Sequence, residues 1–195
     1  MIPDLVPLDH PELPRLVEAA LETGQILVFP TETIYGIGGN PWDVGVVERV
    51  RKLKGRSAKQ PFTLHLHATS AIPTLARVGS ETQARIDQLL PGPYTLLLHA
   101  TSAAPPSAVL DGVVGVRVPD HSFFSKTLSE LKRPIFGTSV NRTGEAPLTD
   151  VNEIIERFPS VDLIVVGGVG SRPSAILDLT VEPPRVLRGD PPETL

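Results

Sequence analysis

The sequence contains no cysteine, which excludes disulfide bonds, thiolate nucleophiles and zinc sites built from thiolates. It also lacks an apolar run long enough to cross a bilayer. The first residues, Met1-Ile2-Pro3-Asp4, lack the basic flank and apolar stretch of a secretory signal. Together these absences predict a protein of the reducing cytoplasm that makes no contact with membranes.

Basic residues are slightly outnumbered, since 18 Lys and Arg stand against 22 Asp and Glu, and the net charge is −4. With 41% apolar residues, the chain can bury a substantial core. A length of 195 residues fits one domain, and neither an internal repeat nor a domain boundary is visible. We therefore expect a single domain over residues 1–195.

Apolar periodicity predicts alternating helices and strands. Helical spacing over residues 13–21 stops at Gly24, and a second helical stripe over residues 46–53 stops at Gly55. Residues 26–29 and 62–67 read as strands, the latter with Thr63, His65 and His67 on a polar face. Further short β-rich runs cover residues 95–98, 114–118, 135–138, 163–166 and 176–179. The fold class is therefore α/β (α+β), with a large, mixed sheet.

Capping-box spacing marks the starts of two further helices. Ser80 precedes Gln83 by three residues, and Asp150 precedes Glu153 in the same way, each pair ahead of an apolar stripe. The 21 prolines cluster in pairs at turns and form no low-complexity linker. We expect helices to begin at both places.

A basic cluster, Lys54-Gly55-Arg56-Ser57-Ala58-Lys59, follows the second helix. Most charge runs are solvated helix faces, and Arg49, Arg51 and Lys52 fit that description. Lys54, Arg56 and Lys59 differ because a glycine-containing loop directs them, and guanidinium and ammonium groups both bind phosphate. The cluster therefore predicts an anion site, with phosphate as the first ligand to consider.

Two other segments place polar groups after buried strands. Residues 30–39, PTETIYGIGG, follow the first strand, where α/β sheets present ligand loops, although a simple tight turn explains them equally well. Ser139 and Asn141 follow the strand at 135–138 and share a face if that strand continues, with an ordinary Ser/Asn turn as the alternative. Arg117 interrupts an apolar strand, so it must be paired or face a cleft. No spacing of His, Asp and Glu indicates a metal site built by the protein.

A series of sequence blocks from about Thr31 to Arg188 resembles the YrdC/TsaC family of threonylcarbamoyl-AMP synthases. In chain order the blocks are PTETIYGIG, KGRSAKQPFTLHLH, PGPYTLLL, VGVRVPDH, GTSVNRTGEAP, SAILDL and VLRGD. Several blocks in fixed order are far more specific than one short motif. The resemblance implies a YrdC-like twisted mixed β-sheet flanked by helices, with a large concave basic cavity. It also implies an enzyme that makes threonylcarbamoyl-AMP and pyrophosphate from L-threonine, bicarbonate or CO2, and ATP, for threonylcarbamoyladenosine (t6A) in tRNA.

The resemblance assigns roles to residues of this chain. Lys54 and Arg56 would be the catalytic residues and, with Ser139 and Asn141, would line the nucleotide site, and Lys59 would join the phosphate clamp. Thr31, Thr33, Tyr35, His67 and Arg117 would hold threonine, whereas Ser174 and Arg188 would reach the nucleotide. Mg²⁺ would be carried by the ATP phosphates. The main departures from the family pattern are Ser57, Val140 and Ala175, of which Ala175 removes one possible hydrogen bond beside Ser174.

Two other functions compete with this one. The first is a carbamoyl-adenylate-forming domain of the hydrogenase-maturation type, which normally lies within a much longer chain. The second is a non-catalytic module that binds double-stranded RNA or tRNA, against which the acidic net charge argues. The expected partners of the synthase are the tRNA-modifying threonylcarbamoyl transferase proteins that receive its product, and weak tRNA binding remains open.

Overall fold

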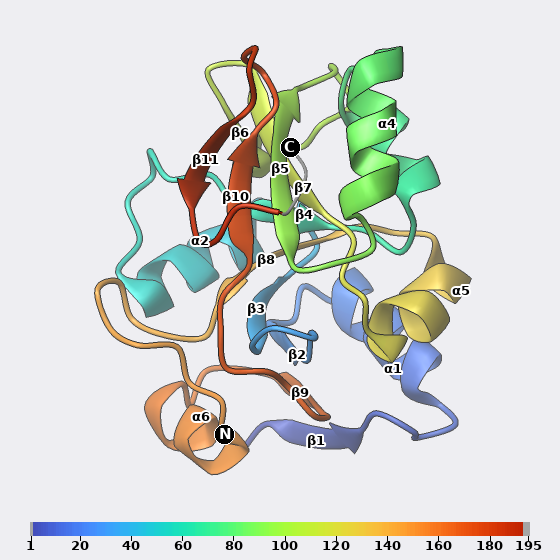
Figure 1. Ribbon diagram of the computed structural model, residues 1–195. Helices are drawn as coiled ribbons and strands as arrows, with labels where there is room; N and C mark the ends of the chain where they lie inside the picture. The colour runs from blue at the N-terminus through green and yellow to red at the C-terminus, as the bar shows by residue number, and fades with distance from the viewer. Residues whose placement is uncertain (1, 193–195) are drawn as a thin grey trace.

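The computed structural model describes residues 2–192, and its centre is one mixed sheet of eleven strands (Figure 1). The strands are β1 (Asp4–Pro7), β2 (Leu27–Phe29), β3 (Gly36–Gly39), β4 (Thr63–His65), β5 (Tyr94–His99), β6 (Val109–Leu110), β7 (Val113–Arg117), β8 (Ile135–Ser139), β9 (Leu163–Val166), β10 (Ala175–Asp178) and β11 (Arg185–Arg188). Their order is β1-β9-β2-β3-β8-β4-β7-β5-β10-β11, and β6 pairs with β7. The large mixed sheet expected from the sequence is confirmed.

The sheet contains both parallel and antiparallel pairs. Parallel pairs join β1 to β9, β2 to β9, β4 to β7 and β5 to β10, and the other neighbours are antiparallel. Six α-helices lie in the described part of the chain: α1 (Leu13–Glu22), α2 (Val44–Lys54), α3 (Ile72–Leu75), α4 (Ser80–Leu89), α5 (Ser129–Leu131) and α6 (Val151–Arg157). Shorter turns are the 3-10 segments η1 (Thr69–Ala71) and η2 (Pro106–Ala108) and the π-helical segment η3 (Phe123–Leu128). None of the described helices is long and apolar enough to cross a bilayer.

Helices α1 and α2 form where the apolar periodicity predicts them. The buried stripe of α1 consists of Leu13, Val17, Ala20 and Leu21. Asp43 caps the start of helix α2, and its carboxylate accepts a hydrogen bond of 3.1 Å from the backbone N–H of Val46. It ends at Gly55, which has a φ of 63° in the left-handed region that glycine adopts without strain. The sequence therefore placed the start of the basic cluster correctly, at the end of a helix.

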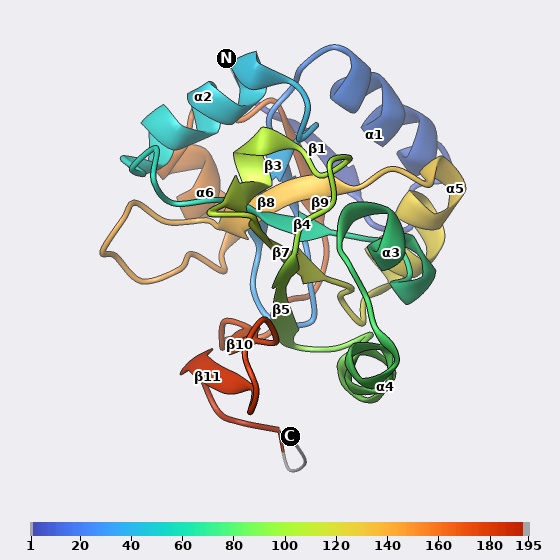
Figure 2. The ribbon, with the colours of Figure 1, turned by 90° about the horizontal axis from the view of Figure 1, so that it is seen from above.

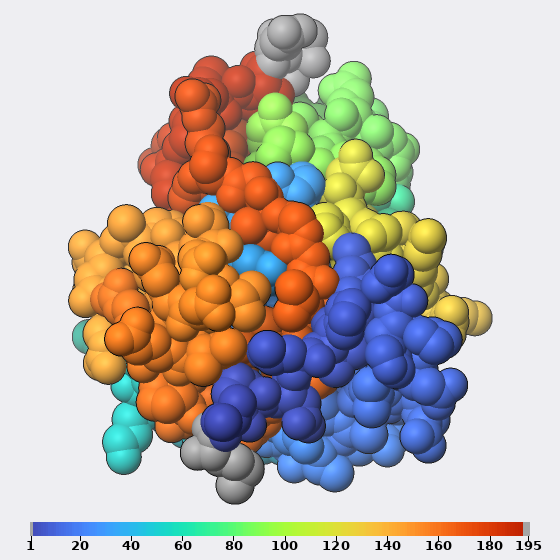
Figure 3. Space-filling view, turned by 90° about the horizontal axis from the view of Figure 1, so that it is seen from below, coloured from blue at the N-terminus to red at the C-terminus, as the bar shows by residue number. Residues whose placement is uncertain are grey.

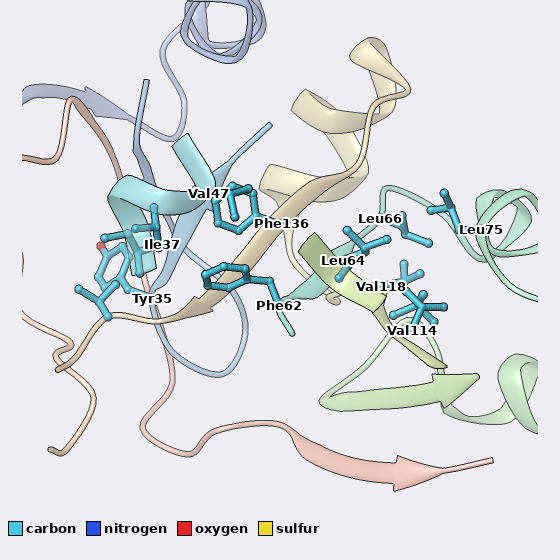
Figure 4. Close-up of a cluster of buried hydrophobic side chains, with 14 of the residues drawn as sticks. Tyr35, Ile37, Val47, Phe62, Leu64, Leu66, Leu75, Val114, Val118 and Phe136 are labelled. Carbon is cyan, nitrogen blue, oxygen red and sulfur yellow. The ribbon is translucent and has the colours of Figure 1, made fainter. Parts of the chain in front are cut away.

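Two apolar clusters lie on opposite faces of the sheet. In one, α1 and η3 pack on Phe29, whose ring centroid lies 5.9 Å from those of Phe123 and Phe124. Figure 2 shows α1 beside α5, which continues η3. In the other, α2 covers β3, and Phe62 packs on Phe136 with ring centroids 4.7 Å apart (Figure 4). Because α1 and η3 cover only part of their face, the rest of it is left for a cavity.

Strand β3 was not expected, because the glycine-rich run at 36–39 was interpreted as part of a ligand loop. In the structure it pairs with both β2 and β8 near the middle of the sheet. A Cβ atom at Gly38 would lie 1.7 Å from the carbonyl oxygen of Phe136, so the backbones approach too closely for any side chain. The ligand loop is thereby restricted to the residues between Phe29 and Gly36.

One predicted helix cap is confirmed and the other is wrong. Asp150 caps α6 by accepting from the backbone N–H groups of Asn152 and Glu153, at 2.9 and 3.0 Å. At α4 the extended residue Gly79 occupies the cap position, and its carbonyl accepts from the N–H of Gln83. Ser80 is already helical, so its hydroxyl cannot make the predicted cap bond.

The hairpin of β10 and β11 forms one edge of the sheet. Strand β10 adds in parallel to β5, and β11 folds back antiparallel to it. Figure 2 shows this hairpin at the side of the sheet away from α1. Residues near the C-terminus are thus brought beside the central strands. The division of residues 1–195 into one domain remains a prediction.

Candidate functional site

A cavity of about 480 Å³ lies on the sheet face that α1 and η3 leave uncovered. Its floor is made by alternate residues of neighbouring strands, since these point to the same face. They are Thr63 and His65 of β4, Thr95 and Leu97 of β5, Gly115 and Arg117 of β7, and Gly137 and Ser139 of β8. The loop after β2 forms one wall, and the hairpin β10–β11 forms another. In Figure 3 the light-blue segment near residue 35 is visible in a hollow between orange and yellow segments.

Arg56 enters the cavity from the loop that follows α2. Its guanidinium donates to the carbonyl oxygens of Pro61 at 2.7 Å and Gln60 at 3.3 Å. It also lies 5.1 Å from the centre of the Phe62 ring, in cation–π geometry. Burial lowers the pKa of Arg56, as do the nearby charges of Arg51 and Arg188. No carboxylate among the described residues pairs with Arg56, so its charge is available to an anionic ligand.

Lys54 lies behind the cavity wall and is only 2% exposed. Its ammonium group donates to the carbonyl oxygens of Ser139 and Asn141, the latter at 2.7 Å, and to Asn141 Oδ1 at 3.3 Å. Burial lowers the pKa of Lys54 to about 7, with Arg56 as the second cause. Protein atoms accept hydrogen bonds from all three N–H groups of Lys54. Instead of the expected direct contact with phosphate, Lys54 therefore binds the segment that carries Ser139 and Asn141.

Ser139 and Asn141 both line the cavity, as the sequence predicted. The Ser139 hydroxyl donates to Asn141 Oδ1 at 2.5 Å, and the Asn141 amide donates to the carbonyls of Arg142 at 2.8 Å and Glu145 at 2.9 Å. The amide therefore fixes the turn after β8. The lone pairs of Ser139 Oγ remain for a ligand donor.

Arg117 was expected either to be paired or to face a cleft. In the structure it does both. It is 4% exposed, and its Nη2 lies 2.8 Å from Oε2 of Glu32. Burial lowers the pKa of Arg117, and the Glu32 carboxylate opposes that shift. Glu32 was missed from the sequence. A buried arginine charge needs a partner, so the sequence did indicate that Arg117 pairs with a carboxylate. It did not indicate which carboxylate.

Ser174 and Arg188 both line the cavity from the C-terminal hairpin. The Ser174 hydroxyl lies 3.0 Å from Thr95 Oγ1, and Arg188 Nη2 donates to the carbonyl of Ser174 at 2.9 Å. Burial lowers the pKa of Arg188, with repulsion from Arg117 as the second cause. Three arginines from different segments, Arg56, Arg117 and Arg188, therefore converge on one cavity.

The hydroxyl groups of the loop after β2 are mostly used to shape that loop. Thr31 Oγ1 donates to the carbonyl of Ile34 at 2.7 Å and accepts from the N–H of Thr33 at 3.1 Å. Tyr35 donates its hydroxyl to the carbonyl of Gly167 at 2.6 Å. Thr31 and Tyr35 line the cavity, whereas Thr33 faces a neighbouring pocket. The structure therefore supports Thr31 and Tyr35 as wall residues more than as free donors.

His67 and Lys59 are placed outside the cavity, contrary to expectation. Strand β4 ends at His65, so the alternation of faces also ends there, and His67 lines a different pocket with Trp42 and Lys132. His65 faces the cavity instead. Burial, followed by the charge of Arg117, lowers the pKa of His65 to about 3, so its imidazole is neutral at physiological pH. Lys59 is exposed on the loop after α2 and does not line the cavity.

Fold and site together define an α/β protein with an arginine-lined cavity on an open sheet face. Comparison with known proteins identifies the family within this class. The family model Sua5/YciO/YrdC, described as "Telomere recombination", matches residues 19–189. The chain therefore belongs to the Sua5/YciO/YrdC family.

Two curated relatives are named threonylcarbamoyl-AMP synthase. The protein of Pyrococcus abyssi is 33% identical over 181 residues, which cover 89% of this chain and 53% of the relative. The protein of Vibrio vulnificus is 31% identical over 175 residues, covering 85% of this chain and 93% of the relative. The chain thus spans about half of one synthase and almost all of the other.

Two solved structures share the fold. Sua5 of P. abyssi in complex with L-threonine has a TM-score of 0.84 at 29% identity, covering 96% of this chain and 57% of that one. YciO of Escherichia coli has a TM-score of 0.86 at 28% identity, covering 96% of both chains. The twisted mixed sheet that the resemblance implied is confirmed.

Proposed function

We propose that this protein is a threonylcarbamoyl-AMP synthase, which joins L-threonine, bicarbonate or CO2, and ATP and releases pyrophosphate. The observation that carries the proposal is the convergence of Arg56, Ser139 and Asn141 with Arg117 and Arg188 in one cavity. These residues come from segments far apart in the sequence, and the P. abyssi and V. vulnificus relatives carry this activity in their names. The product would serve the formation of t6A in tRNA.

The reaction needs alignment and charge neutralisation more than a protein nucleophile. Threonine's amine forms an N–C bond with CO2 and loses a proton, giving a carbamate. A carbamate oxygen then bonds to the α-phosphorus of ATP as the bond to the β-phosphate oxygen breaks and pyrophosphate leaves. Arg56, which has no counter-ion in the described chain, would stabilise the negative charge that builds on the phosphates.

The proposed sites divide the cavity into two ends. The end with Arg56, Ser139 and Asn141 would hold the phosphates, with Lys54 fixing the last two residues from behind. The end with Arg117 would hold threonine, with His65 taking the position first assigned to His67. Because His65 stays neutral, it would act as a hydrogen-bonding group.

ATP is proposed as a substrate, and Mg²⁺ as a companion of its phosphates. Residues 2–192 contain no cluster of three or more His, Asp or Glu side chains that could hold a metal ion. We therefore propose that Mg²⁺ is bound mainly by phosphate oxygens and water, the usual arrangement for this ion with nucleotides. When bound, the ion would neutralise part of the triphosphate charge.

The test is pyrophosphate release measured with each substrate omitted in turn. We expect release to require ATP, threonine and bicarbonate together. Release that requires carbamoyl phosphate and ignores threonine would favour the carbamoyl-adenylate reaction. A rise in melting temperature with tRNA, without any rise with ATP and threonine, would favour an RNA-binding module. Cytoplasmic location and transfer of the product to tRNA-modifying transferases belong to the same proposal.

A further inference from the structure

The three cavity arginines differ in how their charge is balanced. Arg56 and Arg188 donate to backbone carbonyls, and neither has a carboxylate partner in the described chain. Arg117 alone among them forms an ion pair, with Glu32. Glu32 itself lines the neighbouring pocket and not the cavity, and Glu145, which does line the cavity, pairs with Arg157. The cavity therefore has an unbalanced positive charge at Arg56 and a balanced one at Arg117.

Glu32 is held firmly in place beside Arg117. Its neighbours Thr31 and Thr33 share a hydrogen bond of 2.8 Å between their hydroxyls, which closes the loop on both sides of it. Gly170 packs so closely that a Cβ there would lie 2.6 Å from the Glu32 carbonyl oxygen. The backbone that carries the Glu32 carboxylate is therefore fixed beside Arg117.

Fold stability alone does not account for this ion pair. Both carboxylate oxygens of Glu32, and Nε and Nη2 of Arg117, are sealed from solvent without a well-aligned hydrogen bond to any described residue. A buried pair with incomplete hydrogen bonding gains little over apolar side chains of the same size. Its clear effect is electrostatic, because it cancels the charge of Arg117 within a site of low dielectric constant.

We propose that Glu32 sets the ligand preference of the Arg117 end, so that it accepts a zwitterionic α-amino acid rather than a plain carboxylic acid. The carboxylate of such a ligand binds Arg117, and its ammonium group stays favourable because Glu32 cancels the local positive charge. The unbalanced Arg56 end suits a polyphosphate for the same electrostatic reason. This inference rests on the proposed function and names a specificity-determining residue for its amino-acid substrate.

The experiment compares binding of threonine and of 3-hydroxybutyrate, which is threonine without its amino group. Affinities are measured by calorimetry with a non-hydrolysable ATP analogue present. Three variants are compared with the wild type: Glu32→Gln, which keeps the shape and removes the charge, Glu32→Asp, which keeps the charge, and Glu182→Gln. The last is the control, since Glu182 forms an exposed ion pair with Arg85 on the surface.

We expect the wild type, Glu32→Asp and Glu182→Gln to prefer threonine by about tenfold or more, the usual scale for a charged hydrogen-bonding partner. In Glu32→Gln this preference should fall by about tenfold, chiefly through tighter binding of 3-hydroxybutyrate. An unchanged ratio in Glu32→Gln, or a larger change in ATP affinity than in threonine affinity, overturns the inference. If Glu32→Gln does not fold, the wild type still provides a test, because equal affinity for threonine and 3-hydroxybutyrate would overturn the inference. Absence of any threonine binding by the wild type would instead refute the proposed function.

Discussion

Lys54 provides the sharpest test of how the anion end of the cavity is built. If its ammonium group acts only by holding Ser139 and Asn141, its loss and the loss of Asn141 must damage the same arrangement. Lys54→Met removes Nζ and keeps an apolar stem of similar length in a site that is 2% exposed. The perturbation therefore leaves carbonyl acceptors without their donor while avoiding a large cavity.

The expected magnitude follows from the three hydrogen bonds. Bonds to a charged group contribute about 1.5–3 kcal/mol each before the cost of burying the charge is subtracted. A net loss of about 3 kcal/mol in transition-state stabilisation corresponds to roughly a hundredfold fall in kcat/KM. We expect Asn141→Ala to cause a fall of similar size. The double variant should then be at most about tenfold worse than either single variant, because both changes disrupt one unit.

Pyrophosphate release under saturating threonine measures these effects, and thermal melting checks that each variant folds. The control cycle joins Arg56→Ala to Asn141→Ala, since these two side chains share no hydrogen bond in the described chain. Their effects should multiply. If Lys54→Met and Asn141→Ala also multiply, Lys54 acts on the ligand independently, and the role assigned to it here is refuted.

Four further outcomes are expected. Arg56→Ala should lower kcat/KM, measured by pyrophosphate release, by about a hundredfold with little change in melting temperature. Lys59→Ala, outside the cavity, should lower kcat/KM in the same assay by less than about threefold. Gly38→Ala should prevent soluble folding, because its Cβ would lie 1.7 Å from a carbonyl oxygen of β8; a normal melting curve contradicts this. The pKa of His65 is about 3 in the folded protein and near 6.5 when unfolded, so the unfolded state binds the extra proton and stability is lost as pH falls below 6.5. The free energy of unfolding, measured with urea, should fall between pH 6.5 and pH 4.5 by about 2 kcal/mol less in His65→Asn than in the wild type. Equal falls in the two proteins would argue against a neutral buried imidazole.

Local patterns in the sequence predicted the elements well where one face of an element meets the core. The stripes of α1 and α2, and the glycines that end them, follow directly from helical periodicity. Strand β3 could not be found in this way, because the reason for its glycines is a backbone approach from β8, which is distant in sequence. A glycine-rich run carries no apolar periodicity, so it resembles a loop.

The site was predicted in composition better than in detail. The alternation of faces along β4 was predicted correctly, but its end after His65 depends on packing, and His67 therefore lies in a different pocket from His65. To find the partner of Arg117, one must know which loop places a carboxylate beside this arginine in space. Similarly, the resemblance assigned Lys54, Ser139 and Asn141 to one site, but it did not show that Lys54 donates to the backbone of the other two residues.

The position of β10 and β11 has a consequence for the newly made chain. Strand β10 pairs with β5, some eighty residues upstream, and Ser174 just before β10 and Arg188 of β11 both line the cavity. A nascent polypeptide that has already folded its central strands would still lack one side of the pocket. The complete pocket would thus form only after the ribosome has released β10 and β11, and termination before residue 174 would leave Arg56 and Arg117 without Arg188.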